Sequence, residues 1–268
     1  NLVIADVLGN VLVELDNYML RSSDKAWGDF GANITTEKDH QMVIGKIGSL
    51  NSFEQREVLP LPLKPSEVRI SIAATGLNFR DVLCALGQMP NASVERLRLG
   101  MECSGIVKEV GRDVTNCKVG DRVVAISNSC FATTALVDSN AVSFLPECLT
   151  FSEGASIPIT FLTCEYALNK LAKLKAGERV LIHAATGGIG LAAIQVAQRI
   201  GAEVFATAGS DEKREYLRRL GIQHVMDSRS QDFADEIAAI TEGEGVDVVL
   251  NSLSGESIPA NFSILKPF

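Results

Sequence analysis

The sequence predicts a chain of two parts, a β-rich half followed by a doubly wound α/β half, with the change near residue 160. Before that point, short Val- and Ile-rich runs with period-two alternation, such as 67–74 and 121–126, are separated by Gly, Pro, Asn and Asp. After it, apolar strand-like runs alternate with amphipathic helical segments. That alternation implies parallel strand pairing with helices on both faces of one sheet.

The α/β half is expected to alternate strands and helices in the order 180–185, 187–202, 203–208, 211–220, 224–228, 232–241 and 247–252. The helix at 211–220 has acidic residues in its first turn and Gly221 just past its end. Asp232 is the expected N-cap of the next helix. In the first helix, one face is expected to carry Ile189, Ala193, Val196, Ala197 and Ile200.

Composition and charge exclude several classes of protein. The formal net charge of −8 argues against a nucleic-acid partner, because phosphate backbones need clustered Lys and Arg. No apolar run approaches the roughly 18 residues of a membrane span, and the chain does not begin with a signal-peptide pattern. The six cysteines are scattered, with no C-x-x-C pair, which indicates reduced thiols in a cytoplasmic protein rather than a metal or redox site.

The stretch HAATGGIGLAA, residues 183–193, joins the first strand of the α/β half to its first helix. A strand that ends in a sharp turn before a helix with free N–H groups can hold a pyrophosphate. The glycine fingerprint aligns as Ala185-x-Gly187-x-x-Gly190, with alanine in place of the first glycine. This context favours a dinucleotide site over an ordinary tight turn. His183, at the end of the strand, is interpreted as a packing residue.

The end of the second α/β strand indicates which dinucleotide binds. An NAD site places Asp or Glu there on the ribose hydroxyls, whereas this chain has Ala208. Gly209 and Ser210 leave room for a 2′-phosphate, and Lys213 and Arg229 supply positive charge. The sequence therefore predicts NADPH. The alternative is that Lys213 and Arg229 are ordinary solvated charges.

Several blocks of the sequence carry a family resemblance. GMECSGIVKEVG and VGDRVVAI resemble medium-chain dehydrogenase/reductases. More specifically, TGLNFRDVLCALG, HAATGGIGLAAIQVA and VDVVLNSLSGE resemble enoyl reductase domains of polyketide synthases and animal-type fatty acid synthases. The resemblance runs from about Gln41 to the last residue. It implies a GroES-like β domain at 41–160 that carries the substrate groove, and a Rossmann NADPH-binding domain at 161–268.

The Rossmann domain is expected to be incomplete at its C-terminal end, since four strands are visible in the sequence and the dinucleotide fold usually has about six. Within it, the contacts expected with NADPH are Thr163, Ala185, Thr186, Gly187, Gly188, Ile189, Gly190, Gly209, Ser210, Lys213, Arg229, Asn251 and Ser252.

The family's zinc enzymes place Cys where this chain has Asn78 and His where it has Met101. Neither Asn nor Met is a usual zinc ligand. We therefore expect no metal, and hydride transfer to an activated C=C bond rather than alcohol oxidation.

The reaction implied by the resemblance is reduction of a trans-2-enoyl thioester carried by an acyl carrier protein, with hydride delivered to the β-carbon. The resulting enolate needs oxyanion stabilisation and a proton. Asn78 and Arg80 are the expected catalytic residues; the alternative is that they only fix a loop together with Asp81. Met89 stands where some bacterial modules have a Tyr. The family's candidate proton donors are expected beyond Phe268.

The N-terminal residues 1–22 resemble the last strands of a synthase dehydratase domain, as a hairpin turning at Gly9 and Asn10, with a linker at 23–40. The alternative is an N-terminal extension that is specific to this chain and packs on the β domain. The resemblance implies a phosphopantetheine-bound enoyl substrate on the acyl carrier protein, with dehydratase and ketoreductase domains as neighbours. A homodimer is compatible with it.

Two other functions stay open at this stage. A free-standing NADPH quinone oxidoreductase shares the nucleotide fingerprint and the missing zinc ligands. The second alternative is that the chain is a non-catalytic fragment. The sheet is expected to be incomplete, and this chain alone is expected to show little turnover.

Overall fold

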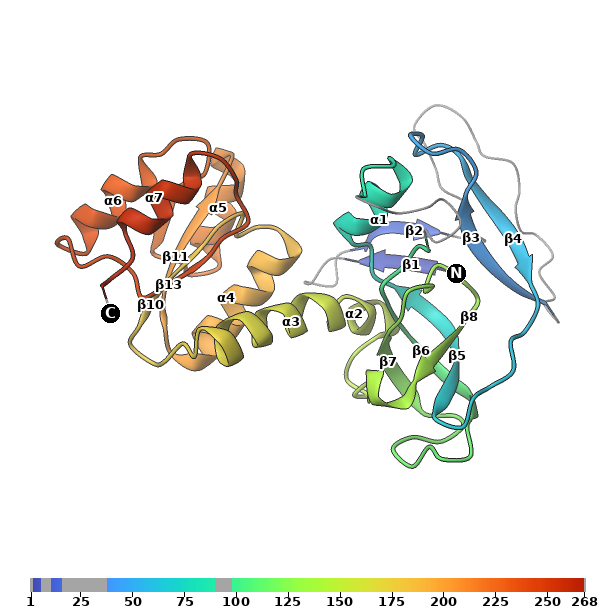
Figure 1. Ribbon diagram of the computed structural model, residues 1–268. Coiled ribbons are helices and arrows are strands. Elements are labelled where there is room, and N and C mark those ends of the chain that lie inside the picture. Colours follow the sequence, from blue (N-terminus) through green and yellow to red (C-terminus); the bar gives the residue numbers. More distant parts are fainter. Residues whose placement is uncertain (1, 6–10, 16–37, 90–97, 268) are drawn as a thin grey trace. The chain divides into compact units, whose positions relative to one another are not determined.

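The computed structural model describes residues 2–5, 11–15, 38–89 and 98–267. The chain divides into two compact units, Asn1–Ile159 and Thr160–Phe268 (Figure 1). Among the described residues, no helix is both long enough and apolar enough to span a membrane.

Unit 1 is built on an antiparallel five-stranded sheet of order β8-β5-β6-β7-β9. Its strands are β5 (Glu67–Thr75), β6 (Glu102–Val110), β7 (Arg122–Ile126), β8 (Thr134–Asp138) and β9 (Val142–Phe144). Alternate apolar side chains face one core, as the period-two pattern predicts. That core contains Val68, Ile70, Cys103, Val107, Val123, Ala125, Cys130, Ala135 and Val137.

Shorter elements complete unit 1. They are the strand pairs β1 (Leu2–Ala5) with β2 (Val11–Leu15) and β3 (Asp39–Ile44) with β4 (Phe53–Val58), and the helices α1 (Phe79–Ala85), η3 (Ser139–Ala141) and α2 (Phe151–Ala155). The expected N-terminal strands pair antiparallel, whereas the turn at Gly9 and Asn10 and the linker residues 23–37 lie outside the described residues. Asp39 and His40, expected in the linker, belong to β3 because they pair with β4.

Unit 2 has a parallel four-stranded sheet of order β12-β11-β10-β13. The strands are β10 (Arg179–Ile182), β11 (Glu203–Ala208), β12 (His224–Asp227) and β13 (Val248–Leu250). The helices are α3 (Pro158–Cys164), the π-helix η4 (Glu165–Leu171), α4 (Gly188–Ile200), α5 (Asp211–Arg219), α6 (Phe233–Ile240) and α7 (Ser257–Ser263). The predicted alternation is confirmed. Asp232 stands at the N-cap position of α6, although its side chain makes no capping bond.

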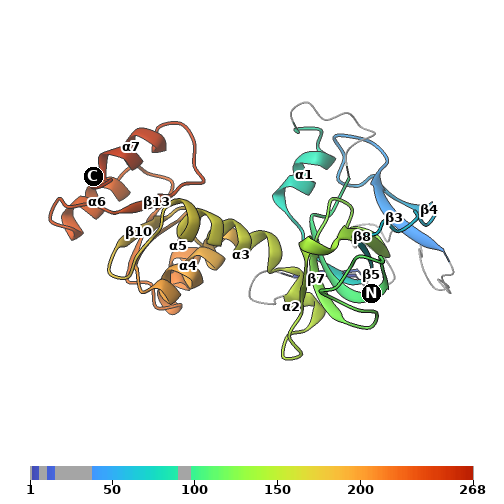
Figure 2. The ribbon, with the colours of Figure 1, turned by 60° about the horizontal axis from the view of Figure 1, so that its bottom comes forward.

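Helices cover both faces of this sheet (Figure 2). One face packs against η4, α4 and α5, and the opposite face packs against α6 and α7. Val180 and Ile182 of β10 belong to the first core and Leu181 to the second, as a strand buried on both faces requires. From β10 the chain moves outward to β11 and β12 and then returns to β13 on the other side of β10. The switch point of the sheet therefore lies between β10 and β13.

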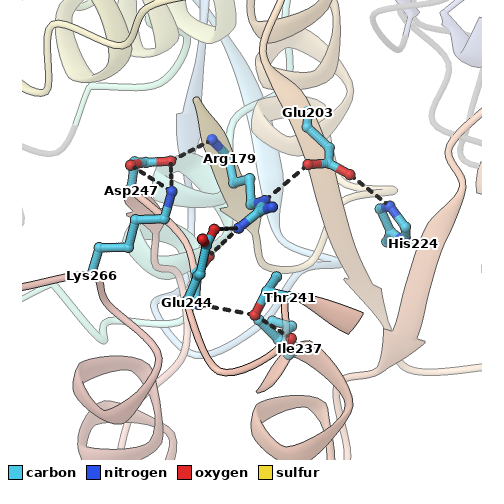
Figure 3. A network of polar contacts seen from close by, with 9 residues as sticks. Arg179, Glu203, His224, Ile237, Thr241, Glu244, Asp247 and Lys266 are labelled. Carbon is cyan, nitrogen blue, oxygen red and sulfur yellow. Dashed lines mark hydrogen bonds and ion pairs between the residues drawn. The ribbon is translucent and has the colours of Figure 1, made fainter. Parts of the chain in front are cut away.

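A charged network joins the amino-terminal ends of the strands (Figure 3). The Arg179 guanidinium donates to Glu203 at 3.1 Å and to Glu244 at 2.8 Å. The backbone N–H of Arg179 donates to Asp247 at 2.7 Å, and His224 Nε2 lies 3.0 Å from Glu203. The fixed carboxylates of this network thus lie at the edge of the sheet opposite the glycine-rich turn.

Candidate functional site

The glycine-rich turn follows the carboxyl end of β10. The strand ends at Ile182 because Ala184 adopts a left-handed conformation with φ of 47°, which breaks the extended backbone. The buried Ala185 donates its backbone N–H to the Thr207 carbonyl at 2.9 Å, and Gly187 is the N-cap of α4. Helix α4 therefore begins directly after the turn, with no acidic residue in its first turn. Its free N–H groups form a site suited to an anion.

Gly190 lies where α4 packs against the turn. A Cβ at this position would lie 2.5 Å from the Cα of Ala185 and 2.6 Å from its carbonyl carbon and oxygen. At Gly187 an added Cβ would meet only the Ala184 carbonyl oxygen, at 3.2 Å. Gly190 is therefore the glycine that the close approach of helix and strand requires.

Helix α3 lies against the start of α4. The Cys164 thiol donates to the Ile189 carbonyl at 3.3 Å, so the preceding Thr163 stands one residue from a contact with the first turn of α4. Burial raises the pKa of Cys164 to about 11, which keeps the thiol protonated at neutral pH. Cys164 thus packs as a neutral side chain.

The carboxyl end of β11 brings together most of the residues expected around a 2′-phosphate. Ala208 is buried, and a Cβ on Gly209 would lie 3.2 Å from Nε of Arg229. The Ser210 hydroxyl accepts from the Lys213 backbone N–H at 3.4 Å and so caps α5. Arg229 therefore lies beside Gly209, and Lys213 stands in the adjoining first helical turn.

Arg214 is a charged residue of this region that sequence reasoning missed. Its guanidinium donates to the Ala208 carbonyl at 3.0 Å and forms ion pairs with Asp211 and, at 3.0 Å, with Asp227. The i,i+3 spacing of Asp211 and Arg214 is the signal that could have revealed it. Arg214 thereby pairs with two carboxylates at this edge of the sheet, those of Asp211 and Asp227.

Asn251 and Ser252 follow β13 at the switch point. The Asn251 side chain closes a turn, accepting from the Leu253 N–H at 2.9 Å and donating to the Leu253 carbonyl at 2.9 Å. It also accepts from Asn261 at 3.1 Å. The amide of Asn251 is therefore held by its own loop and by Asn261 of α7.

In unit 1, Asn78 caps α1 and is held by a residue that sequence reasoning missed. Its Nδ2 donates to Glu102 Oε1 at 2.8 Å, and Glu102 Oε2 accepts from the Ile159 N–H at 2.8 Å. Asp81 accepts from the backbone N–H groups of Asn78 at 3.0 Å and Gly100 at 2.9 Å. Burial raises the pKa of both Glu102 and Asp81, against the opposing effect of these hydrogen bonds.

The other expected residues of unit 1 make no hydrogen bond with Asn78 or Glu102 that the structure records. Arg80 donates to the Arg98 carbonyl at 3.3 Å. Met89 packs against the apolar cluster of Cys84, Leu99 and Phe131. Within the residues that the structure describes, no group of three or more His, Cys, Asp or Glu side chains could hold a metal ion.

Comparisons with known proteins identify relatives of both units. The family model "Alcohol dehydrogenase GroES-like domain" matches residues 64–158, and "Zinc-binding dehydrogenase" matches 188–268. A phenolphthiocerol/phthiocerol polyketide synthase of Mycobacterium tuberculosis is 44% identical over 223 residues, which are 83% of this chain and 10% of that protein. The chain therefore spans about a tenth of the length of this relative.

Two solved structures extend the comparison. The CurK enoyl reductase is 45% identical with a TM-score of 0.81, over 85% of this chain and 71% of that one. The Escherichia coli quinone oxidoreductase complexed with NADPH is 29% identical with a TM-score of 0.74, over 85% of this chain and 70% of that one. The likeness to the enoyl reductase is thus the stronger of the two in both measures.

Proposed function

Because the chain belongs to the enoyl reductases of polyketide synthases, within the medium-chain dehydrogenase/reductases, we propose that it reduces a trans-2-enoyl thioester to the saturated acyl thioester with NADPH. We propose that the substrate is carried on phosphopantetheine by an acyl carrier protein. The dehydratase and ketoreductase domains of the same synthase would be its neighbours. The identity with a polyketide synthase over 83% of this chain supports these partners.

The observation that carries the choice of NADPH is the charge balance at the carboxyl end of β11. Ala208 occupies the position where an NAD site has a carboxylate, and Arg229 lies beside Gly209. Two nearby carboxylates, Asp211 and Asp227, are paired with Arg214. This end of the sheet therefore favours the ribose 2′-phosphate of NADPH over the ribose 2′-hydroxyl of NADH.

The cofactor, when bound, supplies the hydride for the β-carbon. The chain's own residues would then have to stabilise the enolate oxygen. The Asn78 amide nitrogen carries two N–H groups, of which one donates to Glu102. We propose that the second donates to the enolate oxygen and that Arg80 adds a positive charge nearby. A preorganised donor of this kind typically contributes about 10²- to 10³-fold in rate.

Asn78 and Met101 stand at positions where zinc enzymes of the superfamily have ligands, and neither is a usual zinc ligand. The side chains present do not fit a catalytic zinc site. Enolate stabilisation therefore falls to hydrogen-bond donors and cations of the chain.

The test compares two substrates with the same chain, crotonyl thioester and a quinone, and follows oxidation of NADPH by its absorbance. We expect low but measurable turnover of the crotonyl thioester, in line with the little turnover expected of this chain alone, and slower turnover with NADH than with NADPH. Turnover of the quinone alone would favour the alternative, a quinone oxidoreductase. Binding of NADPH without turnover of either substrate would refute the reductase activity and leave the cofactor assignment intact.

A further inference from the structure

Four polar side chains form a continuous hydrogen-bonded chain beneath the carboxyl ends of β11, β10 and β13, which we call the His183 network. His183 Nδ1 lies 2.8 Å from Thr207 Oγ1, and Nε2 lies 2.7 Å from Asn261 Oδ1. Asn261 Nδ2 donates to Asn251 Oδ1 at 3.1 Å. Thr207, His183 and Asn261 are all buried. A buried polar group that lost its partner here would carry a desolvation cost, so the network favours one arrangement.

The backbone of Leu253 fixes the direction of the bonds between Asn251, Asn261 and His183 Nε2. Its N–H can only donate, so the Asn251 atom that it contacts is the amide oxygen. That oxygen also faces Asn261, which must present its amide nitrogen there and its oxygen to His183. His183 Nε2 therefore carries the proton. In a neutral ring Nδ1 is then bare and accepts from the Thr207 hydroxyl.

His183 connects two parts of the nucleotide site. His183 directly precedes Ala184, where the glycine-rich turn begins. The backbone N–H of His183 donates to the Leu250 carbonyl of β13 at 3.2 Å. Through Asn261, its ring reaches the turn at Asn251–Leu253. Ligands of doubly wound sheets bind outside the carboxyl ends of the strands at the switch point, which here lies between β10 and β13.

We propose that His183 is a positioning residue of the nucleotide site, whose neutral Nε2–H tautomer fixes the Asn251–Leu253 turn against the crevice between β10 and β13. This inference rests on the proposed function for the identity of the ligand, of which the nicotinamide half would lie at this crevice. The adenosine 2′-phosphate would lie at the end of β11, beside Gly209 and Arg229.

The surroundings of His183 keep it neutral. Burial lowers its pKa, against a smaller opposing effect of the hydrogen bond with Asn261, and no charged group contributes to the shift. The Phe233 ring stands edge-on to the imidazole at a centroid distance of 5.0 Å. A protonated ring would donate from both nitrogens, so the Thr207 hydroxyl would have to reverse.

The test uses His183→Phe, which keeps an aromatic ring and removes both hydrogen bonds, and His183→Gln, whose amide can still donate toward Asn261. The control is His224→Gln, because His224 belongs to the same unit but lies at the amino ends of the strands (Figure 3). Binding of NADPH and of 2′,5′-ADP, which lacks the nicotinamide half, is measured by fluorescence titration or calorimetry.

We expect His183→Phe to weaken NADPH binding by about tenfold, the factor that corresponds to one hydrogen bond of ordinary strength. Binding of 2′,5′-ADP should change by less than about twofold, and His183→Gln should retain most of the NADPH affinity. His224→Gln should change neither ligand. If His183→Phe does not fold, Thr207→Val, which removes only the hydroxyl, should show the same selectivity with a smaller effect.

Equal weakening of both ligands would mean that His183 serves only the fold, and unchanged NADPH binding would exclude a positioning role; either result overturns the inference. Failure of the unsubstituted chain to bind NADPH would refute the proposed function instead. In that case, long-range nitrogen–proton NMR spectra still test the network, and a proton on Nδ1 rather than Nε2 would overturn it.

Discussion

Replacing Gly190 by Ala is expected to separate α4 from the glycine-rich turn. The added Cβ would lie 2.5 Å from Cα of Ala185 and 2.6 Å from its carbonyl atoms, whereas carbon atoms in contact are ordinarily about 3.5–4.0 Å apart. All of these atoms belong to the backbone, so no change of rotamer can relieve the overlap. The start of α4 must therefore move by roughly 1 Å.

That displacement sets the size of two effects. Overpacking of this kind costs about 1–3 kcal/mol of the free energy of unfolding. A shift of about 1 Å also lengthens a hydrogen bond of about 2.9 Å beyond its useful range, so N–H groups of α4 would lose their contact with a pyrophosphate. We expect NADPH affinity to fall by about ten- to a hundredfold, which corresponds to one or two such bonds.

Thermal unfolding and a fluorescence titration with NADPH measure the two effects. The matched variant is Gly187→Ala, where the added Cβ meets one oxygen at 3.2 Å and should cost clearly less stability than Gly190→Ala. If Gly190→Ala retained both its melting temperature and its NADPH affinity, the close packing of α4 on Ala185 would be disproved.

Three further substitutions test other parts of the site. Lys213→Glu should raise the KM for NADPH far more than the KM for NADH, with the exposed Lys170→Glu as control; equal effects on both nucleotides would exclude a phosphate contact. Ala184→Gly should raise the free energy of unfolding by up to about 1 kcal/mol, measured by urea denaturation, because glycine relieves the left-handed strain at φ 47°. Since burial raises the pKa of Glu102 above its ordinary 4.5, the folded chain binds that proton more tightly than the unfolded chain. The free energy of unfolding of the unsubstituted chain, relative to that of Glu102→Gln, should therefore rise as the pH falls through the raised pKa toward 4.5. Urea titrations measure this difference, and a difference that does not change with pH would contradict the reasoning.

The parts of the fold that local pattern determines could be predicted from the sequence. The alternation of strands and helices in unit 2 follows from hydrophobic periodicity, and the buried face of α4 contains the expected Ala193, Val196 and Ala197. The helical segments α3, η4 and α7 were not anticipated. The left-handed residue of the turn is Ala184 rather than one of the glycines. The backbone hydrogen bonds of its neighbours, from His183 to Leu250 and from Ala185 to Thr207, outweigh the intrinsic preference of alanine.

The missed site residues depend on contacts that are distant in sequence. Glu102 binds groups 24 and 57 residues away, and His183 binds Asn261 across 78 residues. No periodicity or spacing reports such pairs. One sign of the Glu102 contact is present in the sequence, namely the glycine at position 76, two residues before Asn78. A Cβ at Gly76 would collide with the Glu102 carboxylate. That glycine marks where the two segments approach each other.

The two edges of the sheet in unit 2 differ in charge in a way that suits a polyanionic ligand. At the amino-terminal edge, Glu203 and Glu244 form ion pairs with Arg179. Asp247 pairs with Lys266 and accepts from the Arg179 backbone N–H. At the carboxyl-terminal edge, by contrast, the His183 network is built from neutral groups, which supply the same structural connection without placing a fixed negative charge near a pyrophosphate.

Two carboxylates at the carboxyl-terminal edge, Asp211 and Asp227, share one partner, Arg214. Removing that guanidinium would therefore uncover two negative charges beside Gly209 and Arg229, where the 2′-phosphate is proposed to bind. On this reasoning, Arg214 supports NADPH binding without touching the cofactor, and Arg214→Ala should weaken NADPH more than NADH. Removing one of the two carboxylates with Asp227→Asn in the same chain should recover part of the loss, because it returns the net charge of this cluster to its value in the unsubstituted chain.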